Sequence, residues 1–282
     1  MSTYSLTFLT PLFSKGSYDD KPEIRPPSIR GQIHWWFRAL GGKYDDEKAI
    51  FGGVHNGTMA SKIVVRVSNV CGQSNIANTL PHKNGGLASP KAAYMPDCSF
   101  TLHILERLGG LADHQQAFER ALHAWLLAGS LGLRSTRGGG AFQWDKAPTR
   151  PDQFRSTLDG LLQGAPLRAA LLDEAFPTAE AARTCATDTI SHQAMARIRF
   201  PLGAVRQGAA DPAPPRKTSP LRLTIRHFDD GYRLIAVWDN RTAVTGNTLR
   251  DLAEASDLLA NGTRVSTPKK IGTLLSNSPL VR

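Results

Sequence analysis

Two arginines and a histidine stand four residues apart near the start of the chain, at Arg30, His34 and Arg38. In an α-helix this spacing places all three side chains on one face. Gly31 lies beside them and leaves backbone uncovered near the helix N-terminus, where the helix dipole favours anions. Guanidinium groups also fork onto phosphate oxygens. The stripe therefore predicts phosphate binding, and the alternative is that its arginines form ordinary surface ion pairs.

A second basic element is glycine-rich and reads L-R-S-T-R-G-G-G-A-F from Leu133 to Phe142. Its arginines and serine can donate hydrogen bonds to phosphate, and its glycines are expected to leave backbone amides unshielded. The residues concerned are Arg134, Ser135, Arg137, Gly138, Gly139 and Gly140. The spacing of a P-loop or of a dinucleotide-binding loop is missing, which disfavours nucleotide hydrolysis. The alternative interpretation is a solvated turn.

A third basic element follows a proline-rich segment that spans residues 207–220. Arg216, Lys217 and Ser219 lie at its end, in the sequence R-K-T-S-P. Two charges in such a segment usually mean only solvation. The element matters if it converges with the other two on one polyanionic ligand.

The helix that carries the arginine stripe is predicted to begin after Pro26-Pro27, with Ser28 as its N-cap. Arg25 and Ser28 then lie at its positive end. Apolar residues at helical spacing form the opposite, buried face. They are Ile29, Ile33, Trp36, Phe37 and Leu40.

Residues 1–150 are predicted to form one α+β domain. The expected elements are a strand at 4–10, helices at 28–40 and 45–53, strands at 62–70 and 99–108, a helix at 114–127 and a strand at 141–144. Residues 71–96 are predicted to be a long loop. The order of strands and long helices is the split βαβ, ferredoxin-like arrangement, which the common RRM-like RNA-binding module shares.

Residues 151–282 give weaker signals and are predicted to form a less regular C-terminal α/β region. Helices are expected at 152–163, 166–176 and 249–259, a strand at 197–205, and a hairpin from strands at 221–228 and 232–238. The hairpin prediction depends on Asp229-Asp230-Gly231, a turn sequence between two apolar runs.

The composition favours a polyanionic partner, because 34 Lys and Arg against 24 Asp and Glu give a net charge of +10 and a pI near 9.8. Cys71, Cys98 and Cys185 contain no C-x-x-C pair, so neither a disulfide framework nor a zinc site is expected, and no cofactor is predicted. The N-terminus lacks the features of a signal peptide and no apolar run reaches the ~18 residues that span a bilayer. We therefore expect a cytoplasmic protein without a membrane partner.

Several of these segments together resemble the RAMP superfamily, the repeat-associated proteins of type III CRISPR effector complexes, and most closely its Cmr-type subunit numbered one. The resemblance is carried by T-P-L-F at 10–13, E-I-R-P-P-S-I-R-G-Q-I-H-W-W-F-R-A-L-G-G at 23–42, I-F-G-G at 50–53, the glycine-rich loop, and R-K-T-S-P-L at 216–221. The helix motif at 23–42 is the segment that is most specific to this family. The chain is short for that subunit, and one ferredoxin-like unit is legible, so the second is expected to be degenerate or merged with the first.

The resemblance implies a non-catalytic subunit of a ribonucleoprotein that binds guide CRISPR RNA, target RNA and other subunits in antiviral defence. Some residues of this chain match, by position, the RNA-contacting residues of the family. They are Arg25, Ser28, Arg30, Gly31, His34, Arg38, Arg134, Arg137 and the three glycines. Binding would be independent of sequence, because the cations neutralise phosphates while base pairing carries specificity.

Two enzymatic alternatives remain open. Related subunits supply an aspartate from the loop after the first strand for metal-dependent cleavage of target RNA, and Asp19 and Asp20 occupy that place here. This alternative makes the chain an endoribonuclease that needs Mg²⁺. The other resembles guide-processing endonucleases and uses His34 as general base, but no second histidine is evident as the acid. A pure protein scaffold is a third possibility, and it predicts assembly without RNA.

Overall fold

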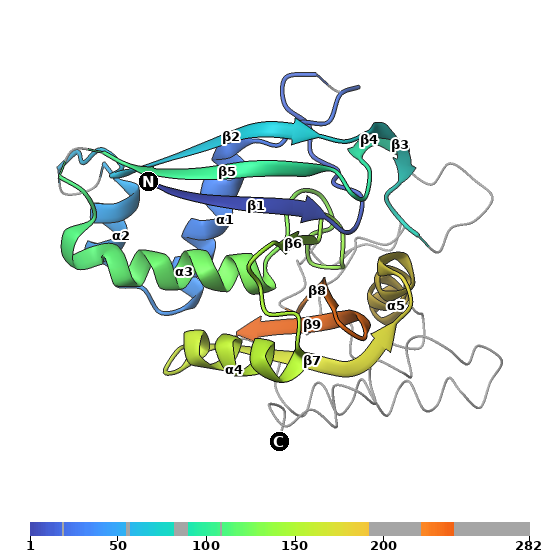
Figure 1. Cartoon of the computed structure of the whole chain (residues 1–282). Coiled ribbons are helices and arrows are strands. Elements are labelled where there is room, and N and C mark those ends of the chain that lie inside the picture. The colour runs from blue at the N-terminus through green and yellow to red at the C-terminus, as the bar shows by residue number, and fades with distance from the viewer. Residues whose placement is uncertain (19, 55–56, 82–89, 108, 192–220, 240–282) are drawn as a thin grey trace, which may run out of the picture.

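A computed structural model describes residues 1–18, 20–54, 57–81, 90–107, 109–191 and 221–239, and within the last helical turn of 179–191 it places the backbone only. Two antiparallel sheets lie one above the other, with most helices between them or at their sides (Figure 1). We call the part from residue 1 to residue 150 the first unit, and the described part from residue 151 onwards the second unit.

The first unit has the predicted ferredoxin-like arrangement. Its sheet runs β2-β5-β1-β6 and consists of β1 (Ser2–Phe8), β2 (Ile63–Cys71), β5 (Ser99–Glu106) and β6 (Phe142–Trp144). Helix α1 (Pro26–Ala39) connects β1 to β2, and α3 (Gln115–Ala128) connects β5 to β6. All the pairings are antiparallel, so two βαβ halves interleave with β1 and β5 at the centre.

Alternating apolar residues explain how this sheet binds its helices. Leu6, Phe8, Phe100 and Leu102 point inward from the two central strands and are buried. The predicted apolar face of α1 is buried against them, together with the inner face of α3. Full burial of such side chains contributes about 1.5–3 kcal/mol each, so this packing fixes which face of α1 lies against the sheet.

The start of α1 differs from the prediction. Arg25 is the N-cap, with an extended backbone, and Pro26-Pro27 occupy the first helical positions. Ser28 is therefore inside the helix and is not its cap. Proline fits the first turn because its fixed φ is already helical and its missing N–H has no partner to lose there.

Two further elements extend the first unit. Helix α2 (Tyr44–Phe51) follows α1, and a short 3₁₀ turn, η1 (Ala112–His114), precedes α3. The predicted loop at 71–96 contains a hairpin of β3 (Ser74–Asn78) and β4 (Pro90–Tyr94). A bridge between Leu12 and Tyr94 ties this hairpin to the chain leaving β1.

The second unit is more regular than predicted. Its sheet runs β7-β9-β8 and consists of β7 (Leu167–Phe176), β9 (Gly231–Asp239) and β8 (Arg222–Phe228). Helix α4 (Pro151–Leu162) precedes β7, and α5 (Ala179–Ser191) follows it. The described β-α-β-β order and strand order match the first three strands of a ferredoxin-like unit. The predicted β8–β9 hairpin is confirmed.

The predicted helix at 166–176 is wrong, because these residues form β7. Both faces of β7 are covered: Leu167, Ala169 and Leu171 pack into the core that α4 shares with the first unit, while Ala170 and Leu172 pack under α5. A strand buried on both faces reads as a continuous apolar run and loses the alternation that identifies strands. The Ala- and Leu-rich sequence therefore resembled a helix.

The predicted elements at 197–205, 207–220 and 249–259 lie outside the described residues. Within the described part of the chain, no helix is both long and apolar enough to cross a membrane.

Candidate nucleic-acid interface

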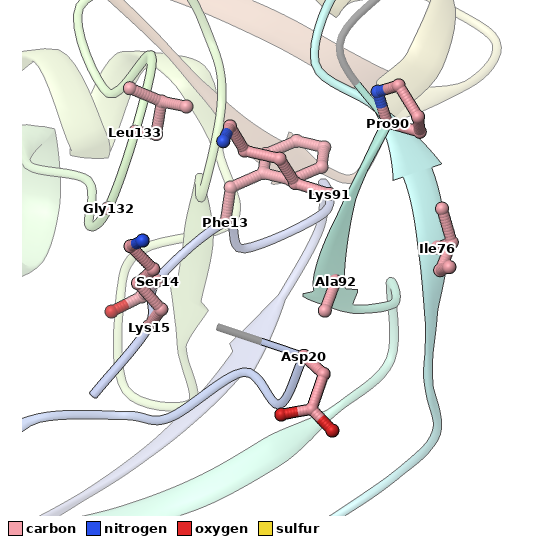
Figure 2. Close-up of a pocket in the computed structure, with 10 residues that line it drawn as sticks. All are labelled: Phe13, Ser14, Lys15, Asp20, Ile76, Pro90, Lys91, Ala92, Gly132 and Leu133. Carbon is pink, nitrogen blue, oxygen red and sulfur yellow. The ribbon is translucent and has the colours of Figure 1, made fainter. Parts of the chain in front are cut away.

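A groove of about 740 Å³ opens beside the N-terminal end of α1. Three segments that are distant in sequence build it, namely the chain leaving β1, the β3–β4 hairpin and the turn before the three glycines (Figure 2). Its lining residues are Phe13, Ser14, Lys15, Asp20, Ile76, Pro90, Lys91, Ala92, Gly132 and Leu133. The volume lies in the range of sites that hold small ligands or single residues of a polymer.

The loop after β1 folds back on itself at the edge of the groove. The backbone N–H of Glu23 donates to the carbonyl of Ser14 at 2.8 Å, and Lys15 forms a β-bridge with Pro22. The loop therefore has a fixed base and an exposed tip. Tyr18 lies at that tip, with 68% of its surface exposed and Lys21 Nζ 5.7 Å from its ring centre.

The groove combines cations with an apolar wall. Lys15 and Lys91 supply two ammonium groups, and Asp20 is the acid among the lining residues. Ile76 and Leu133 are large apolar side chains that remain exposed, at 69% and 45%. Exposed apolar surface next to lysines suits a ligand that has both flat apolar faces and negative charge, as a nucleotide has.

The N-terminus of α1, which carries the predicted site residues Arg25 and Ser28, adjoins the groove. A small hollow that shares Ser14 and Gly132 with the groove is lined on its other side by Arg25 and Ser28, both exposed. Gly31 lies in the same part of the helix, and a Cβ there would meet nothing within 4 Å. The positive end of the helix dipole and Arg25 thus lie next to the groove that Lys15 lines.

The rest of the arginine stripe contacts α2. Arg38 donates from Nε and Nη2 to the two carboxylate oxygens of Glu47, at 2.9 and 2.5 Å, and His34 Nε2 lies 2.9 Å from Glu47 Oε1. These hydrogen bonds, that of Arg38 first, lower the pKa of Glu47. Arg30 donates to the carbonyl of Phe51 and lies over its ring. The ion-pair interpretation therefore describes Arg38, and the stripe fastens α2 to α1.

The three glycines do not present free amides, so that prediction is wrong. Gly138 N–H donates to Leu223 at 2.8 Å, Gly139 N–H to Arg134 at 3.1 Å and Gly140 N–H to Pro11 at 3.1 Å, all to backbone carbonyls. All three glycines are buried. Thr10 Oγ1 donates to the Gly138 carbonyl at 2.7 Å. The loop joins the end of β1 to β8 of the second unit.

Arg134, Ser135 and Arg137 are half-buried on the same loop. Arg134 has a left-handed backbone with φ 63°, and Arg137 forms a parallel bridge with Leu223. The Ser135 carbonyl accepts a hydrogen bond from Ser130 Oγ at 2.6 Å. The predicted contacts at Arg216, Lys217 and Ser219 lie outside the described residues.

Of the predicted acidic pair, Asp20 lines the groove and is exposed, whereas Asp19 lies outside the described residues. In the part of the chain that the structure describes, no group of three or more His, Cys, Asp and Glu is placed to hold a metal ion. Asp20 is thus placed to repel a phosphate or to orient a cation, and it is the one carboxylate among the described residues that line the groove.

On the described central strands, the outer face of the first sheet holds no Phe, Tyr or Trp on which an RRM-like sheet would stack bases. The outward positions of the central strands hold Thr3, Ser5 and Thr7 on β1, and Thr101 and His103 on β5. His103 is itself hydrogen-bonded at 2.7 Å, between Nε2 and Ser68 Oγ. The groove is therefore a better candidate for base contacts than this face.

Sequence reasoning missed Lys15, Lys91 and Leu133 as site residues. Phe13 and Leu133 fall in segments that the resemblance marked, at 10–13 and in the glycine-rich loop. The others lie on loops and a weak strand with no motif, and their convergence depends on the hairpin, which the sequence did not reveal.

The sequence profile of the RAMP superfamily matches residues 5–143, almost the whole of the first unit. The first unit is therefore a RAMP superfamily domain, and the resemblance predicted from the sequence is confirmed. Over 72 residues the chain is 36% identical to the CRISPR system Cmr subunit Cmr1-2 of Pyrococcus furiosus, an alignment that covers 22% of this chain and 37% of that protein. The match thus spans less than two fifths of that relative's length.

Solved structures show the same fold over most of the chain. The apo form of Cmr1 from Pyrococcus furiosus matches with a TM-score of 0.60 at 17% identity, covering 86% of this chain and 89% of the other. A chain of the Type III-B Cmr-beta complex, bound to cognate target RNA and AMPPnP in the presence of ssDNA, matches with a TM-score of 0.58 at 10% identity. That match covers 97% and 98% of the two chains.

Proposed function

We propose that this chain is a non-catalytic RNA-binding subunit of a type III CRISPR effector complex, in which the groove and the N-terminus of α1 hold the backbone of guide or target RNA. The observation that carries the proposal is the convergence of Lys15, Lys91 and the positive helix end, with Arg25, around one apolar-walled groove. Its neighbours are other subunits of the same ribonucleoprotein.

The chemistry of the groove suits single-stranded RNA. Lysine and arginine neutralise phosphates without reading sequence. The side chains of Ile76 and Leu133 give a base or ribose an apolar surface to lie on. Because base pairing elsewhere carries specificity, this subunit needs only to hold the backbone.

The comparisons support the setting. A structural relative is a chain of a Cmr-beta complex bound to cognate target RNA. Its likeness to this chain is one of fold, and we extend RNA binding from that complex to this chain on the evidence of the groove.

The test is the salt dependence of RNA binding by Lys15→Ala/Lys91→Ala, measured by fluorescence anisotropy with a labelled single-stranded RNA. We expect weaker binding, and a slope of log K against log salt that becomes shallower by about 0.7 for each phosphate that the variant no longer neutralises. Lys43→Ala/Lys146→Ala is the matched control, because it removes the same charge from two exposed lysines outside the groove. An equal loss in the control would show that net charge, and not the groove, binds RNA.

A further inference from the structure

We propose that Arg183, on helix α5 of the second unit, is a positioning residue that holds the wall of the RNA groove in place. The proposal rests on the function proposed above for the groove. It makes the groove a product of both units, although every residue that lines it belongs to the first.

Arg183 contacts two parts of the groove from behind. Its Nη2 donates to the backbone carbonyl of Thr79 at 3.2 Å, with the Asn78 carbonyl at 3.4 Å, where β3 ends. Its guanidinium carbon lies 5.6 Å from the ring centre of Phe13. Phe13 lines the groove, and Asn78 pairs with Pro90, which lines it too. One side chain therefore links the segment after β1 to the hairpin that carries Lys91.

Because Arg183 is buried, its charge depends on these contacts. Only 3% of the residue is exposed, and Glu180, its acidic neighbour at 3.4 Å, is itself 57% exposed at the side chain. A buried charge must be satisfied by hydrogen bonds, and here much of that comes from the carbonyls at the end of β3. If the hairpin moves away, the guanidinium loses partners that water cannot easily replace. The hairpin and α5 are thus coupled.

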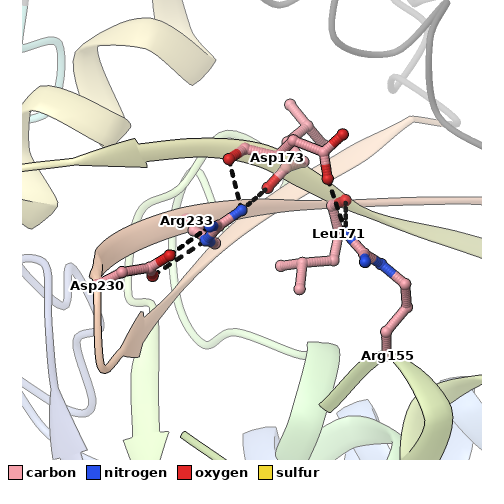
Figure 3. A network of polar contacts seen from close by, with 6 residues as sticks. Arg155, Leu171, Asp173, Asp230 and Arg233 are labelled. Atoms are coloured by element: carbon pink, nitrogen blue, oxygen red, sulfur yellow. Dashed lines mark hydrogen bonds and ion pairs between the residues drawn. The ribbon is translucent and has the colours of Figure 1, made fainter. Parts of the chain in front are cut away.

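The position of α5 is fixed by the strand before it. The register of β7 on β9 shifts between Leu171 and Ala175, and Figure 3 shows arginines holding this irregular stretch. Arg233 donates to the carbonyls of Leu172 and Asp173, at 3.2 and 2.5 Å, and Arg155 donates to Asp173 Oδ1 at 2.8 Å. The bend that such an irregularity introduces sets the direction in which the chain enters α5.

Arg222 also joins the two units but is not among the residues that line the groove, which makes it a useful control. The guanidinium carbon of Arg222, on β8, lies 3.7 Å from the ring centre of Trp35 on α1. Trp35 lies outside the groove lining. Replacement of Arg222 removes a comparable contact between the units and should leave the groove wall intact.

The decisive experiment is a double-mutant cycle on RNA affinity. We expect Arg183→Met to weaken binding about fivefold, and Lys91→Ala to cost less in that background than in the wild type, because Lys91 is no longer held in place. In the Arg222→Met background Lys91→Ala should cost its full amount. Additive effects of Arg183→Met and Lys91→Ala would overturn the proposal.

Hydrogen exchange of the full chain without RNA tests the same coupling independently. Arg183→Met should speed amide exchange at residues 74–78 and 91–94, whereas Arg222→Met should not. Arg183→Lys, which keeps the charge but loses the fork, should give an intermediate rate, and it decides the question if the methionine variant fails to fold. Unchanged exchange in the hairpin would overturn the proposal. Because this measurement uses no RNA, failure of the Lys15 and Lys91 test would reject the groove as an RNA site without deciding the role of Arg183.

Discussion

Helix α1 holds Arg38 at the surface, where 63% of its side chain is exposed and its described hydrogen bonds go to Glu47. Strand β8 holds Arg226 with no exposed surface, among carbonyl oxygens and against the ring of Phe142. Arg226 Nη2 donates to the carbonyls of Leu126 and Gly129 at 3.1 and 2.8 Å, at the C-terminal end of α3. Its burial lowers its pKa to about 9.

The difference shows that the positions of basic residues in a sequence do not by themselves reveal which of them bind a ligand. Arg226 satisfies a helix end, where carbonyl groups lack partners and the dipole favours a cation. Arg38 sits in water beside a carboxylate, where the same charge is screened and contributes little. Several arginines of the described residues thus join parts of the chain to one another, and the lining of the groove contains lysines but no arginine.

The largest expected effect is that of Arg226→Met. It leaves the buried carbonyls of Leu126 and Gly129 without their donor, and we expect the free energy of unfolding to fall by about 4 kcal/mol. Chemical denaturation followed by circular dichroism measures the change. Arg38→Ala is the matched variant, with an expected loss below about 1 kcal/mol. Equal losses would contradict the expectation that the buried Arg226 stabilises the fold more than the exposed Arg38 does.

Gly140→Ala tests whether the glycine-rich loop is a buried junction. Gly140 has φ +58°, and a Cβ there would lie 2.0 Å from the Leu131 carbonyl oxygen. Left-handed strain and this clash should together lower the free energy of unfolding by about 3 kcal/mol.

Gly164→Ala separates the two causes of that loss. Gly164 has φ +71°, but a Cβ there would meet nothing within 4 Å. The substitution should therefore lower the free energy of unfolding by only about 1 kcal/mol. Denaturation midpoints of the two variants compare them. An equally small loss for Gly140→Ala would mean that the loop yields to the added methyl group, contrary to a tightly packed junction.

Glu47→Gln tests the exposed side of the comparison through pH. The folded pKa of Glu47 is lowered below its ordinary value of 4.5, chiefly by Arg38. The stability that Glu47 contributes is therefore present above that value and is lost as pH falls through the lower, folded pKa. We expect the variant to lose about 1 kcal/mol near neutral pH and to match the wild type in acid. Thermal melts across this pH range measure it, and a constant difference at every pH would contradict the assignment.

Asp20→Asn should have the smallest effect. It removes a negative charge from the groove lining, so we expect single-stranded RNA to bind about twofold more tightly in low salt. Anisotropy titrations measure the gain. The same RNA incubated with Mg²⁺ should stay intact with both proteins. Cleavage by the wild type that Asp20→Asn abolishes would instead support the endoribonuclease alternative.

Much of the fold could be predicted from the sequence because most elements of the first unit have one buried and one open face. The alternation in β1 and β5 and the 3.6-residue period in α1 and α3 follow directly from that geometry. The β8–β9 hairpin was legible from its Asp-Gly turn. Strand β7 was not, because burial on both faces removed its alternation.

The candidate site was predicted only in part. Arg25 and Ser28 follow from the start of α1, which prolines mark clearly. Whether Gly138–Gly140 are open or buried depends on the carbonyls of Pro11 and Leu223, which are far away in sequence. Glycine composition is the same in both cases. Likewise, Lys15 and Lys91 line one groove because long-range contacts such as the pairing of Leu12 with Tyr94 bring their segments together, and no local pattern marks that pairing.

The irregular stretch of β7 has a consequence for how this chain tolerates length changes. One face of the strand serves the core shared with α4 and the other serves α5. Deleting a single residue between Leu171 and Ala175 would turn every later side chain of β7 to the opposite face of the sheet. The entry of the chain into α5 would rotate with it, and Arg183 would no longer point toward the end of β3. A deletion in the second sheet would thus change the position of Lys91 in the first unit.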